Sequence, residues 1–408
     1  MRRVVVTGAA GVTALGNDWP TIRARMEAGD TATRTMEDWA RYEGLNTRLA
    51  APVPDFDVEE LYPRKKLRTM GRVSRLATYA TERALDKAGL LNTRELTNGR
   101  TGVAYGSSFG STAPVVAFAD LMTKGTTRNL TATSYIQMMS HTAAVNIGLF
   151  FRITGRIIPT SSACTSGSQG IGYAYEAIRY GLQDIMVTGG AEELCPSMAA
   201  VFDTLYATST RNDRPDTAPR PFDVARDGLV IGEGAATLIL EARDHALARG
   251  ANILAEIVGF GTNSDGNHVT QPQAETMQGA LRLALQDADL DAQAIGFISG
   301  HGTATEGGDI AESQATHAVM GSSIPFHSLK GHFGHTLGAC GAIEAWLSIA
   351  MQADRWFPPT ANLAAVDPRC APLDYVMGSA RAIDTEYLMS NNFAFGGINT
   401  SLILRQVA

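Results

Sequence analysis

Apolar runs with the period of a strand alternate along this chain with apolar patterns of helical period, and this alternation most limits what it can fold into. Strands are predicted at Arg3–Thr7, Thr101–Tyr105, Ile185–Thr188, Ile295–Ser299 and Leu402–Leu404. Helical patterns stand between them, at Val73–Ala88, Met277–Leu285 and Gly338–Met351. Alternating strands and helices are typical of α/β folds. We therefore expect an α/β protein.

Two stretches of the second half resemble stretches of the first. Arg3-Val-Val-Val-Thr-Gly resembles Glu256-Ile-Val-Gly-Phe-Gly, and Thr101-Gly-Val-Ala-Tyr-Gly resembles Ile295-Gly-Phe-Ile-Ser-Gly. The helix start at Cys164 also has a counterpart in the stretch 334–341. These echoes suggest a duplicated core with halves at residues 1–248 and 249–408. In such a duplication Cys164 and His335 lie at equivalent helix starts and face one site.

Charge and cysteine content exclude several classes of protein. The 408 residues carry a net charge of -7, which disfavours nucleic-acid binding. The chain has no apolar run of membrane-spanning length. The apolar run Val4–Val6 is broken by Thr7 and is too short for a signal peptide. Four cysteines, with no close pair among them, indicate a reduced, cytoplasmic protein; they are Cys164, Cys195, Cys340 and Cys370.

Cys164 is the leading candidate for a nucleophile. It lies among small residues in the stretch 159–170, just before a helical pattern formed by Ile171, Ala174, Tyr175 and Ile178. A thiol at a helix N-terminus feels the positive end of the helix dipole, which favours the thiolate. The alternative is a buried and inert cysteine. The local pattern does not decide between the two.

Two histidines lie in glycine-rich settings. His301 follows a predicted strand in the stretch 300–309, and His335 ends the stretch 328–335. A metal site formed by these residues and His332 is not favoured, because no acidic or cysteine ligand stands at a recognised zinc spacing. The glycine run 4–11 suggests a dinucleotide-binding turn, but no acidic residue follows a second strand at the required distance.

Taken in order, four motifs resemble those of the elongating β-ketoacyl-acyl carrier protein (ACP) synthases of types I and II. They are Ala163-Cys-Thr-Ser-Gly, His301-Gly-Thr-Ala-Thr, Lys330 five residues before His335, and the run Asn391–Asn399 with the pattern Asn-x-Phe-x-Phe-Gly-Gly-x-Asn. The resemblance extends from residue 3 to about residue 405. It implies the thiolase fold, in which two duplicated α/β halves stack as five αβαβα layers.

The resemblance also implies a reaction in fatty-acid or polyketide and polyene chain elongation. An acyl group would pass to Cys164, and malonyl-ACP would lose CO2 and attack the resulting thioester. His301 and His335 would donate hydrogen bonds to the enolate oxygen, and the backbone N–H groups of Cys164 and Phe395 would form the oxyanion hole. Lys330 would orient the histidines within a polar network with Glu344, and Asp309 and Glu312 are further candidates for that network.

Substrate contacts follow from the same resemblance. Thr303 and Thr305 match positions that bind the pantetheine arm, although they could simply cap a turn. Phe393 and Phe395 match the gate beside the nucleophile. Phe109 matches a position that borders the acyl channel, and its size favours short or flat unsaturated acyl chains. The alternative is that its ring swings aside and does not limit the chain.

Acyl carrier proteins are acidic, so a basic docking patch is expected. The candidates are Arg64, Lys65, Lys66, Arg68 and Arg72, with Arg211 as a further one, and the alternative is an ordinary solvated helix face. The resemblance implies no metal and no cofactor beyond the carrier's phosphopantetheine. It implies a homodimer, or a heterodimer with a related ketosynthase-like chain.

Three other functions share some of these sequence features. A thiolase acting on coenzyme A thioesters would need a second cysteine near the C-terminus, and the turn 391–399 has none. A non-catalytic chain-length-factor-like protein would lack the nucleophile at Cys164, although this chain could be the active partner of one. A dinucleotide-binding protein is suggested only by the weak N-terminal glycine run.

Overall fold

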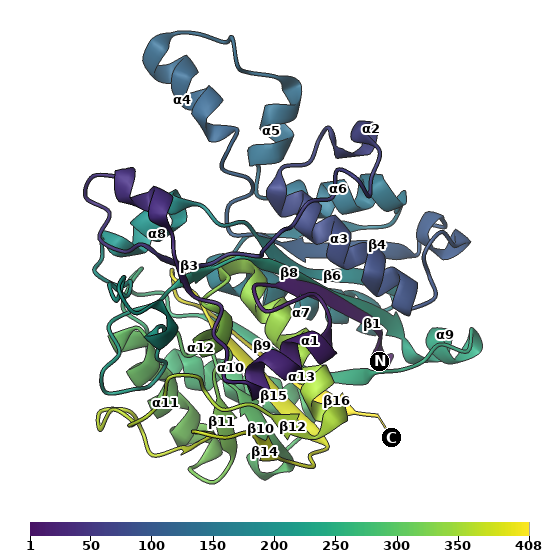
Figure 1. The fold of residues 1–408 in the computed structure, drawn as a ribbon. Helices are drawn as coiled ribbons and strands as arrows, with labels where there is room; N and C mark the ends of the chain where they lie inside the picture. The colour runs from purple at the N-terminus through teal and green to yellow at the C-terminus, as the bar shows by residue number, and fades with distance from the viewer. Residues whose placement is uncertain (408) are drawn as a thin grey trace.

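One eleven-stranded sheet forms the centre of the protein, in a computed structural model that describes residues 1–407 (Figure 1). It contains two groups of five strands with the same order, joined by one short antiparallel pairing. The first group consists of β1 (Val4–Thr13), β4 (Thr101–Gly106), β5 (Ile157–Thr160), β6 (Ile185–Glu192) and β8 (Gly234–Ala242). The second consists of β9 (Ala255–Ser264), β10 (Ile295–Ser299), β11 (Pro325–His327), β15 (Tyr387–Phe393) and β16 (Ile398–Gln406).

The strand orders show that the two groups are copies of one topology. The first reads β5-β4-β6-β8-β1 and the second β11-β10-β15-β16-β9, so both read 3-2-4-5-1 along their own part of the chain. In each, the last strand runs antiparallel to both neighbours, and the remaining pairs are parallel. The stretches that echo one another in the sequence fall on β1 and β9 and on β4 and β10. The predicted duplication is confirmed.

Helices separate and cover the two groups of strands. Helices α3 (Arg72–Lys87) and α6 (Thr142–Phe151) cover the outer face of the first group, and α10 (Ala274–Ala288) and α11 (Glu306–Met320) cover that of the second (Figure 1). Helices α7 (Ser166–Arg179) and α13 (Cys340–Asp354) lie between them. One large hydrophobic cluster fills each interface between helices and strands. The result is the predicted thiolase-like αβαβα sandwich.

The two central helices bring the halves of the chain together. Almost all of α13 is buried, as its apolar sequence predicts, and α7 buries its predicted face of Ile171, Ala174, Tyr175 and Ile178. A Cβ atom on Gly167 would lie 3.0 Å from both the Gly338 carbonyl oxygen and the Ala342 nitrogen. Glycine at this point therefore lets the two helix starts touch, and it places Cys164 against the second half.

The N-terminal glycine run is part of a strand. Gly8 and Gly11 both lie within β1, and a Cβ atom on Gly11 would lie 2.4 Å from the ring of Trp346. These glycines make room for neighbouring helices rather than for a phosphate. The structure therefore removes the dinucleotide-binding alternative.

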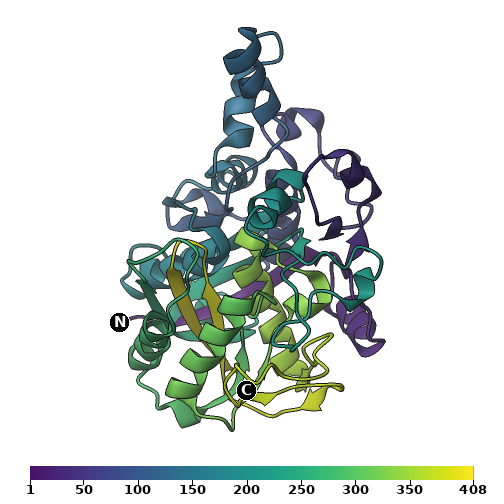
Figure 2. The ribbon, with the colours of Figure 1, turned by 90° about the vertical axis from the view of Figure 1, so that its left-hand side faces the viewer.

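Smaller elements surround this core. Helices α4 (Val115–Lys124) and α5 (Ala132–Met138) project from the body (Figures 1 and 2). The other helices are α1 (Trp19–Glu27), α2 (Arg64–Leu67), α8 (Pro196–Asp203), α9 (Arg243–Ala248) and α12 (Lys330–Phe333). The remaining strands are β2 (Arg34–Thr35), β3 (Leu49–Ala51), β7 (Ile231–Gly232), β12 (Trp356–Phe357), β13 (Asp374–Tyr375) and β14 (Arg381–Ala382). Within residues 1–407, no helix is both long and apolar enough to cross a bilayer.

Candidate active site

Cys164 lies in a short 3-10 turn, Ala163–Thr165, that leads into α7. The matching turn Leu337–Ala339 leads into α13, and Ala163 and Leu337 both adopt the left-handed conformation, with φ of 51° and 45°. The positional counterpart of Cys164 is therefore Gly338. The predicted pair of equivalent helix starts is present, but His335 lies two residues before its turn, so its own counterpart is Ser161.

A bridge to β7 holds the backbone of His335 in place. The His335 N–H donates to the Val230 carbonyl at 2.7 Å, and the Gly232 N–H donates to the His335 carbonyl at 2.8 Å. His301 follows the end of β10 after one residue, Gly300. The two histidines thus approach Cys164 on separate segments of the second half.

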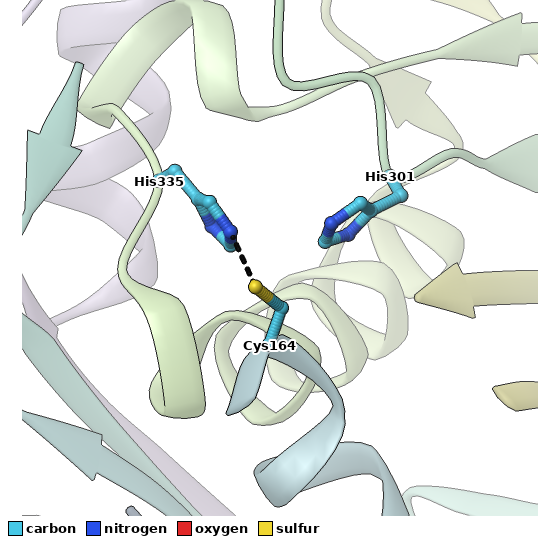
Figure 3. Close-up of side chains that lie close together, drawn as sticks. All are labelled: Cys164, His301 and His335. Atoms are coloured by element: carbon cyan, nitrogen blue, oxygen red, sulfur yellow. Dashed lines mark hydrogen bonds between the residues drawn. The ribbon is translucent and has the colours of Figure 1, made fainter. Parts of the chain in front are cut away.

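The sulfur of Cys164 faces both imidazole rings (Figure 3). His335 Nε2 lies 3.0 Å from Cys164 Sγ, and the two ring centroids are 5.1 Å apart with their planes at 89°. The sulfur and one nitrogen of each ring all lie within 4.8 Å of one another, and all three residues are buried. The structure therefore brings the three predicted groups into one site.

Burial sets the resting protonation state of the sulfur. It raises the pKa of the Cys164 thiol to about 11, although the backbone N–H of Phe395, the charge of Lys330 and the backbone N–H of Cys164 itself all act to lower it. The helix start favours the thiolate, as expected, but desolvation outweighs this effect in the free site. The free site holds a thiol, and His335 Nε2 is positioned to take its proton.

Both histidines are neutral at physiological pH. Burial, followed by the nearby charge of Lys330, holds the pKa of His301 and of His335 well below the usual range of histidine. A neutral imidazole offers one N–H donor and one acceptor nitrogen. Each ring can therefore donate to a developing oxyanion once its tautomer places the proton on the nitrogen that faces the substrate.

Lys330 and Glu344 form a fully buried ion pair behind the histidines. Burial alone would lower the pKa of Lys330, but the adjacent Glu344 carboxylate outweighs it and the pKa is raised. Lys330 therefore stays charged. Its positive potential favours the neutral state of the histidines and lowers the energy of a thiolate at Cys164.

Sequence reasoning missed two members of this network, Asn392 and Cys340. Asn392 Nδ2 lies 2.6 Å from Glu344 Oε2, 3.3 Å from His301 Nδ1 and 3.7 Å from Cys340 Sγ. The Cys340 thiol donates to the Cys164 carbonyl at 3.2 Å. The two-residue period of β15 could have pointed to Asn392. Leu388 packs in the central hydrophobic cluster, and Asn392, four residues later in the strand, faces the same side of the sheet.

His301, Cys340 and Glu344 present three potential metal-ligand atoms within 4.8 Å of one another. The amide nitrogen of Asn392 lies within bonding reach of all three, so a hydrogen-bond donor stands where a cation would have to bind. The two hydrogens of that amide nitrogen go to the two nearer acceptors, Glu344 Oε2 and His301 Nδ1, while Cys340 Sγ lies farther away at 3.7 Å.

Asp309 and Glu312 are buried carboxyl groups beside this network, and the negative charge of Glu312 acts on Lys330, as expected of a member. Glu312 accepts the backbone N–H groups of His301 and Gly302 at 2.5 and 2.6 Å. Asp309 accepts the backbone N–H groups of Phe222, Thr303 and Ala304, at 2.6, 3.0 and 3.1 Å respectively. Burial raises the pKa of Glu312 to about 8 and that of Asp309 to about 6. These carboxyl groups shape the loop that carries His301.

A cavity of about 500 Å³ leads to the sulfur. Its lining includes Cys164, His301, His335 and four of the predicted substrate contacts, namely Thr303, Thr305, Phe393 and Phe395. The hydroxyl groups of the two threonines lie 2.9 Å apart, and the Phe395 ring packs edge-on against Phe202. The side chain of Tyr206, which also lines the cavity, is 89% exposed and marks its mouth.

Phe109 does not line this cavity. Its side chain is 41% exposed, and its neighbour Ser108 is held by two hydrogen bonds, from its own N–H to Glu192 and from the Ser161 hydroxyl to its carbonyl. The expected narrowing of the acyl channel by Phe109 is not found within this single chain.

The basic run divides into free and committed residues. Arg64, Lys65, Lys66 and Arg68 are exposed on or beside α2. Arg72 instead pairs with the buried Glu233, with Nη2 2.9 Å from Oε2. Arg211 pairs with Asp227 and donates to the Ala225 carbonyl at 2.6 Å. Neither of the last two is a free docking group, because each already holds a partner within the chain.

Comparisons with known proteins agree with this arrangement. The β-ketoacyl synthase N-terminal domain matches residues 1–246, and the β-ketoacyl synthase C-terminal domain matches residues 254–364. The chain is 36% identical over 415 residues to 3-oxoacyl-[acyl-carrier-protein] synthase 2 of Vibrio harveyi, covering 100% of this chain and 99% of the relative.

Solved structures give the same result. A β-ketoacyl synthase from Burkholderia phymatum STM815 is 60% identical, with a TM-score of 0.99 and full coverage of both chains. The ishigamide ketosynthase/chain length factor is 32% identical, with a TM-score of 0.90 and full coverage of both chains.

Proposed function

The chain belongs to the β-ketoacyl synthase family, and from this membership we propose how its buried site works. The protein is a 3-oxoacyl-ACP synthase, an acyltransferase that joins an acyl group to a malonyl-derived unit on an acyl carrier protein. One observation carries the assignment of its residues: the sulfur of Cys164 lies 3.0 Å from His335 Nε2, with the ring of His301 beside them.

Cys164 is the nucleophile of the first half-reaction. As the acyl-carrier thioester arrives, His335 Nε2 takes the thiol proton and the sulfur attacks the acyl carbonyl. The bond to the carrier's thiol then breaks, and that thiol leaves with the proton. The backbone N–H groups of Cys164 and Phe395 hold the oxyanion, in keeping with their stabilising effect on the sulfur's negative charge.

His301 and His335 serve the second half-reaction. Malonyl-ACP loses CO2, and the electron pair of the broken C–C bond forms an enolate whose oxygen accepts hydrogen bonds from the two rings. The enolate carbon then attacks the Cys164 thioester, and the sulfur departs and regains a proton. Each donor is worth about 3 kcal/mol of barrier in a site of this kind. Lys330 and Glu344 support the rings from behind.

The pantetheine arm of the carrier enters through the cavity. Thr303 and Thr305 hydrogen-bond to the pantetheine arm, and Phe393 and Phe395 line the cavity beside the Cys164 sulfur. The exposed residues Arg64, Lys65, Lys66 and Arg68 attract the acidic carrier. Apart from the phosphopantetheine on the carrier, no cofactor takes part in this mechanism.

The protein acts as a dimer, either of two copies or with a related chain. The likeness to the ishigamide ketosynthase/chain length factor favours the heterodimer as a second candidate.

The boundary between the halves is placed after residue 248, where α9 ends, ahead of β9 at Ala255. Four free cysteines support a cytoplasmic location. A thiolase is disfavoured because, among the described residues, Cys164 is the one cysteine that lines the cavity.

Acylation of the protein tests this function. Wild-type protein and the Cys164→Ala variant are each incubated with a panel of acyl-ACPs of different length and saturation, and intact mass reports the covalent adduct. We expect one acyl group on the wild type and none on the variant, and then a β-ketoacyl-ACP two carbons longer when malonyl-ACP is added. Equal acylation of the variant would place the nucleophile elsewhere.

A further inference from the structure

We propose that Asn392 is a positioning residue that fixes the tautomer of His301, so that Nδ1 accepts a hydrogen bond and Nε2 carries the ring proton. The proposal rests on the function assigned above, because it makes His301 a dedicated donor to the enolate oxygen. It concerns a residue that the sequence motifs did not single out.

The orientation of the Asn392 amide follows from its neighbours. An ionised carboxylate only accepts hydrogen bonds. Burial raises the pKa of Glu344, but the charge of Lys330 and the bond between the two side chains oppose this effect and keep the carboxylate ionised. The group 2.6 Å from Glu344 Oε2 must therefore be the NH2 end of the amide. The reverse orientation would place the amide oxygen against a carboxylate oxygen, with no proton between them.

The second hydrogen of that NH2 group determines the state of His301. An amide nitrogen has two hydrogens, and the one not used by Glu344 points to His301 Nδ1 at 3.3 Å. Nδ1 must accept this hydrogen bond, so it cannot carry a proton in the neutral ring. The ring proton is then on Nε2. Because the buried ring is neutral, it carries one proton, and Nδ1 and Nε2 are not both protonated.

The packing around Asn392 keeps the amide from turning. Asn392 on β15 pairs with Thr400 on β16, and the Thr400 hydroxyl donates to the Asn392 backbone carbonyl at 3.2 Å. A Cβ atom on Gly341 would lie only 2.5 Å from Asn392 Oδ1. The side chain is thus enclosed between α13 and the loop of His301, with no exposed surface.

His335 differs from His301 in this respect. Among residues 1–407, its Nδ1 has no hydrogen-bond partner, and its Nε2 contacts the sulfur. No neighbour therefore fixes its tautomer, and the ring can take the thiol proton in one half-reaction and donate in the other. The structure assigns the two imidazoles different duties, with His335 as the proton shuttle and His301 as the fixed donor.

The Asn392→Asp variant tests the assignment with little change of shape. In this variant the oxygen that replaces Nδ2 shares a proton with Glu344 Oε2. A lone pair of that oxygen accepts a hydrogen bond from His301 Nδ1–H, so the ring proton moves to Nδ1 and Nε2 loses its donor. We expect the 15N chemical shifts of His301 to change from the Nε2–H pattern to a pattern with Nδ1 protonated, the signal being assigned with His301→Ala. Removing one donor of this type lowers the rate by about 100-fold. We therefore expect that fall in kcat for CO2 release from malonyl-ACP, with KM and Cys164 acylation preserved.

The matched control is Asn391→Asp. Asn391 is the preceding residue of β15, is equally buried and has no side-chain partner within the described chain, so it adds the same buried carboxyl group without reaching His301. We expect it to leave the His301 15N pattern unchanged. The variant Asn392→Ala, which removes the amide without adding charge, serves if either acidic variant unfolds, and we expect a mixture of His301 tautomers.

The outcomes separate the possible explanations. An unchanged His301 tautomer in both Asn392 variants would overturn the proposal. An equal loss of acylation and CO2 release, with a lowered Tm and wild-type 15N shifts, would also overturn it, because that result indicates a purely structural role for Asn392. A wild-type protein that releases no CO2 would instead refute the proposed function. In that case the 15N measurement would still decide whether Asn392 sets the tautomer.

Discussion

Replacing Lys330 with methionine removes one member of the buried ion pair and keeps a side chain of similar length. The Glu344 carboxylate would then be fully buried without a counter-charge, and breaking such a pair typically costs 3–5 kcal/mol. Asn392 still donates to Glu344 Oε2 at 2.6 Å, so we place the loss of unfolding free energy near the lower end, at about 3 kcal/mol.

The pH dependence of this loss identifies its cause. In the variant, burial without Lys330 raises the pKa of Glu344 above its unfolded value of about 4.3. The folded state then binds more protons than the unfolded state, so stability falls as pH rises above that value. We expect a larger deficit at pH 8 than at pH 6.

Urea unfolding at both pH values measures the effect. The double variant Lys330→Met with Glu344→Leu removes both charges, and it should recover most of the lost stability because no unpaired charge remains. A deficit below about 1 kcal/mol in the single variant, with the same pH dependence as the wild type, would refute the reasoning that the pair is charged and buried.

Three further predictions follow from the structure. Alkylation of Cys164 by iodoacetamide should keep rising with pH by about tenfold per unit from pH 7 to 10, because the thiol has a pKa of about 11, and a plateau near pH 8 would contradict this. Reversing the charges of Arg64, Lys65 and Arg68 to glutamate should raise KM for acyl-ACP, most strongly at low salt. The control Arg72→Glu should chiefly lower stability, because it loses the bond between Arg72 and Glu233. Wild-type carrier kinetics in the triple variant would rule out this docking patch. Gly11→Ala should cost about 1–3 kcal/mol through its clash with Trp346, while Gly307→Ala, which meets only Pro272 at 4.0 Å, should not, and calorimetry distinguishes the two.

Periodic patterns predicted the fold well because both halves rest on regular elements. The echo between residues 3–8 and 256–261 identified the first strand of each half, and the apolar stretch 338–351 identified a helix buried between two sheets. The bounds were less accurate. The first strand extends to Thr13 through two glycines, because neighbouring helices need the room that those glycines leave.

The site was only partly predictable, because its electrostatics depend on the folded surroundings. Motif order pointed to Cys164, His301 and His335, but the helix start alone could not show that burial outweighs its effect and raises the pKa of the Cys164 thiol. The contact of Asn392 with His301 joins residues 91 positions apart in the sequence. No local pattern could reveal that contact, and the same holds for the exposure of the Phe109 side chain.

The most direct test of the account is a single-turnover measurement of CO2 release. Protein already acylated on Cys164 is mixed with malonyl-ACP labelled in its free carboxyl group, and labelled CO2 and elongated product are followed together in the wild type and in His301→Ala. We expect one CO2 per product in the wild type, and release slowed by about 100-fold or more in the variant although its cysteine stays acylated. Release at the wild-type rate without His301 would contradict the claim that one sulfur and two imidazoles form a single condensing site.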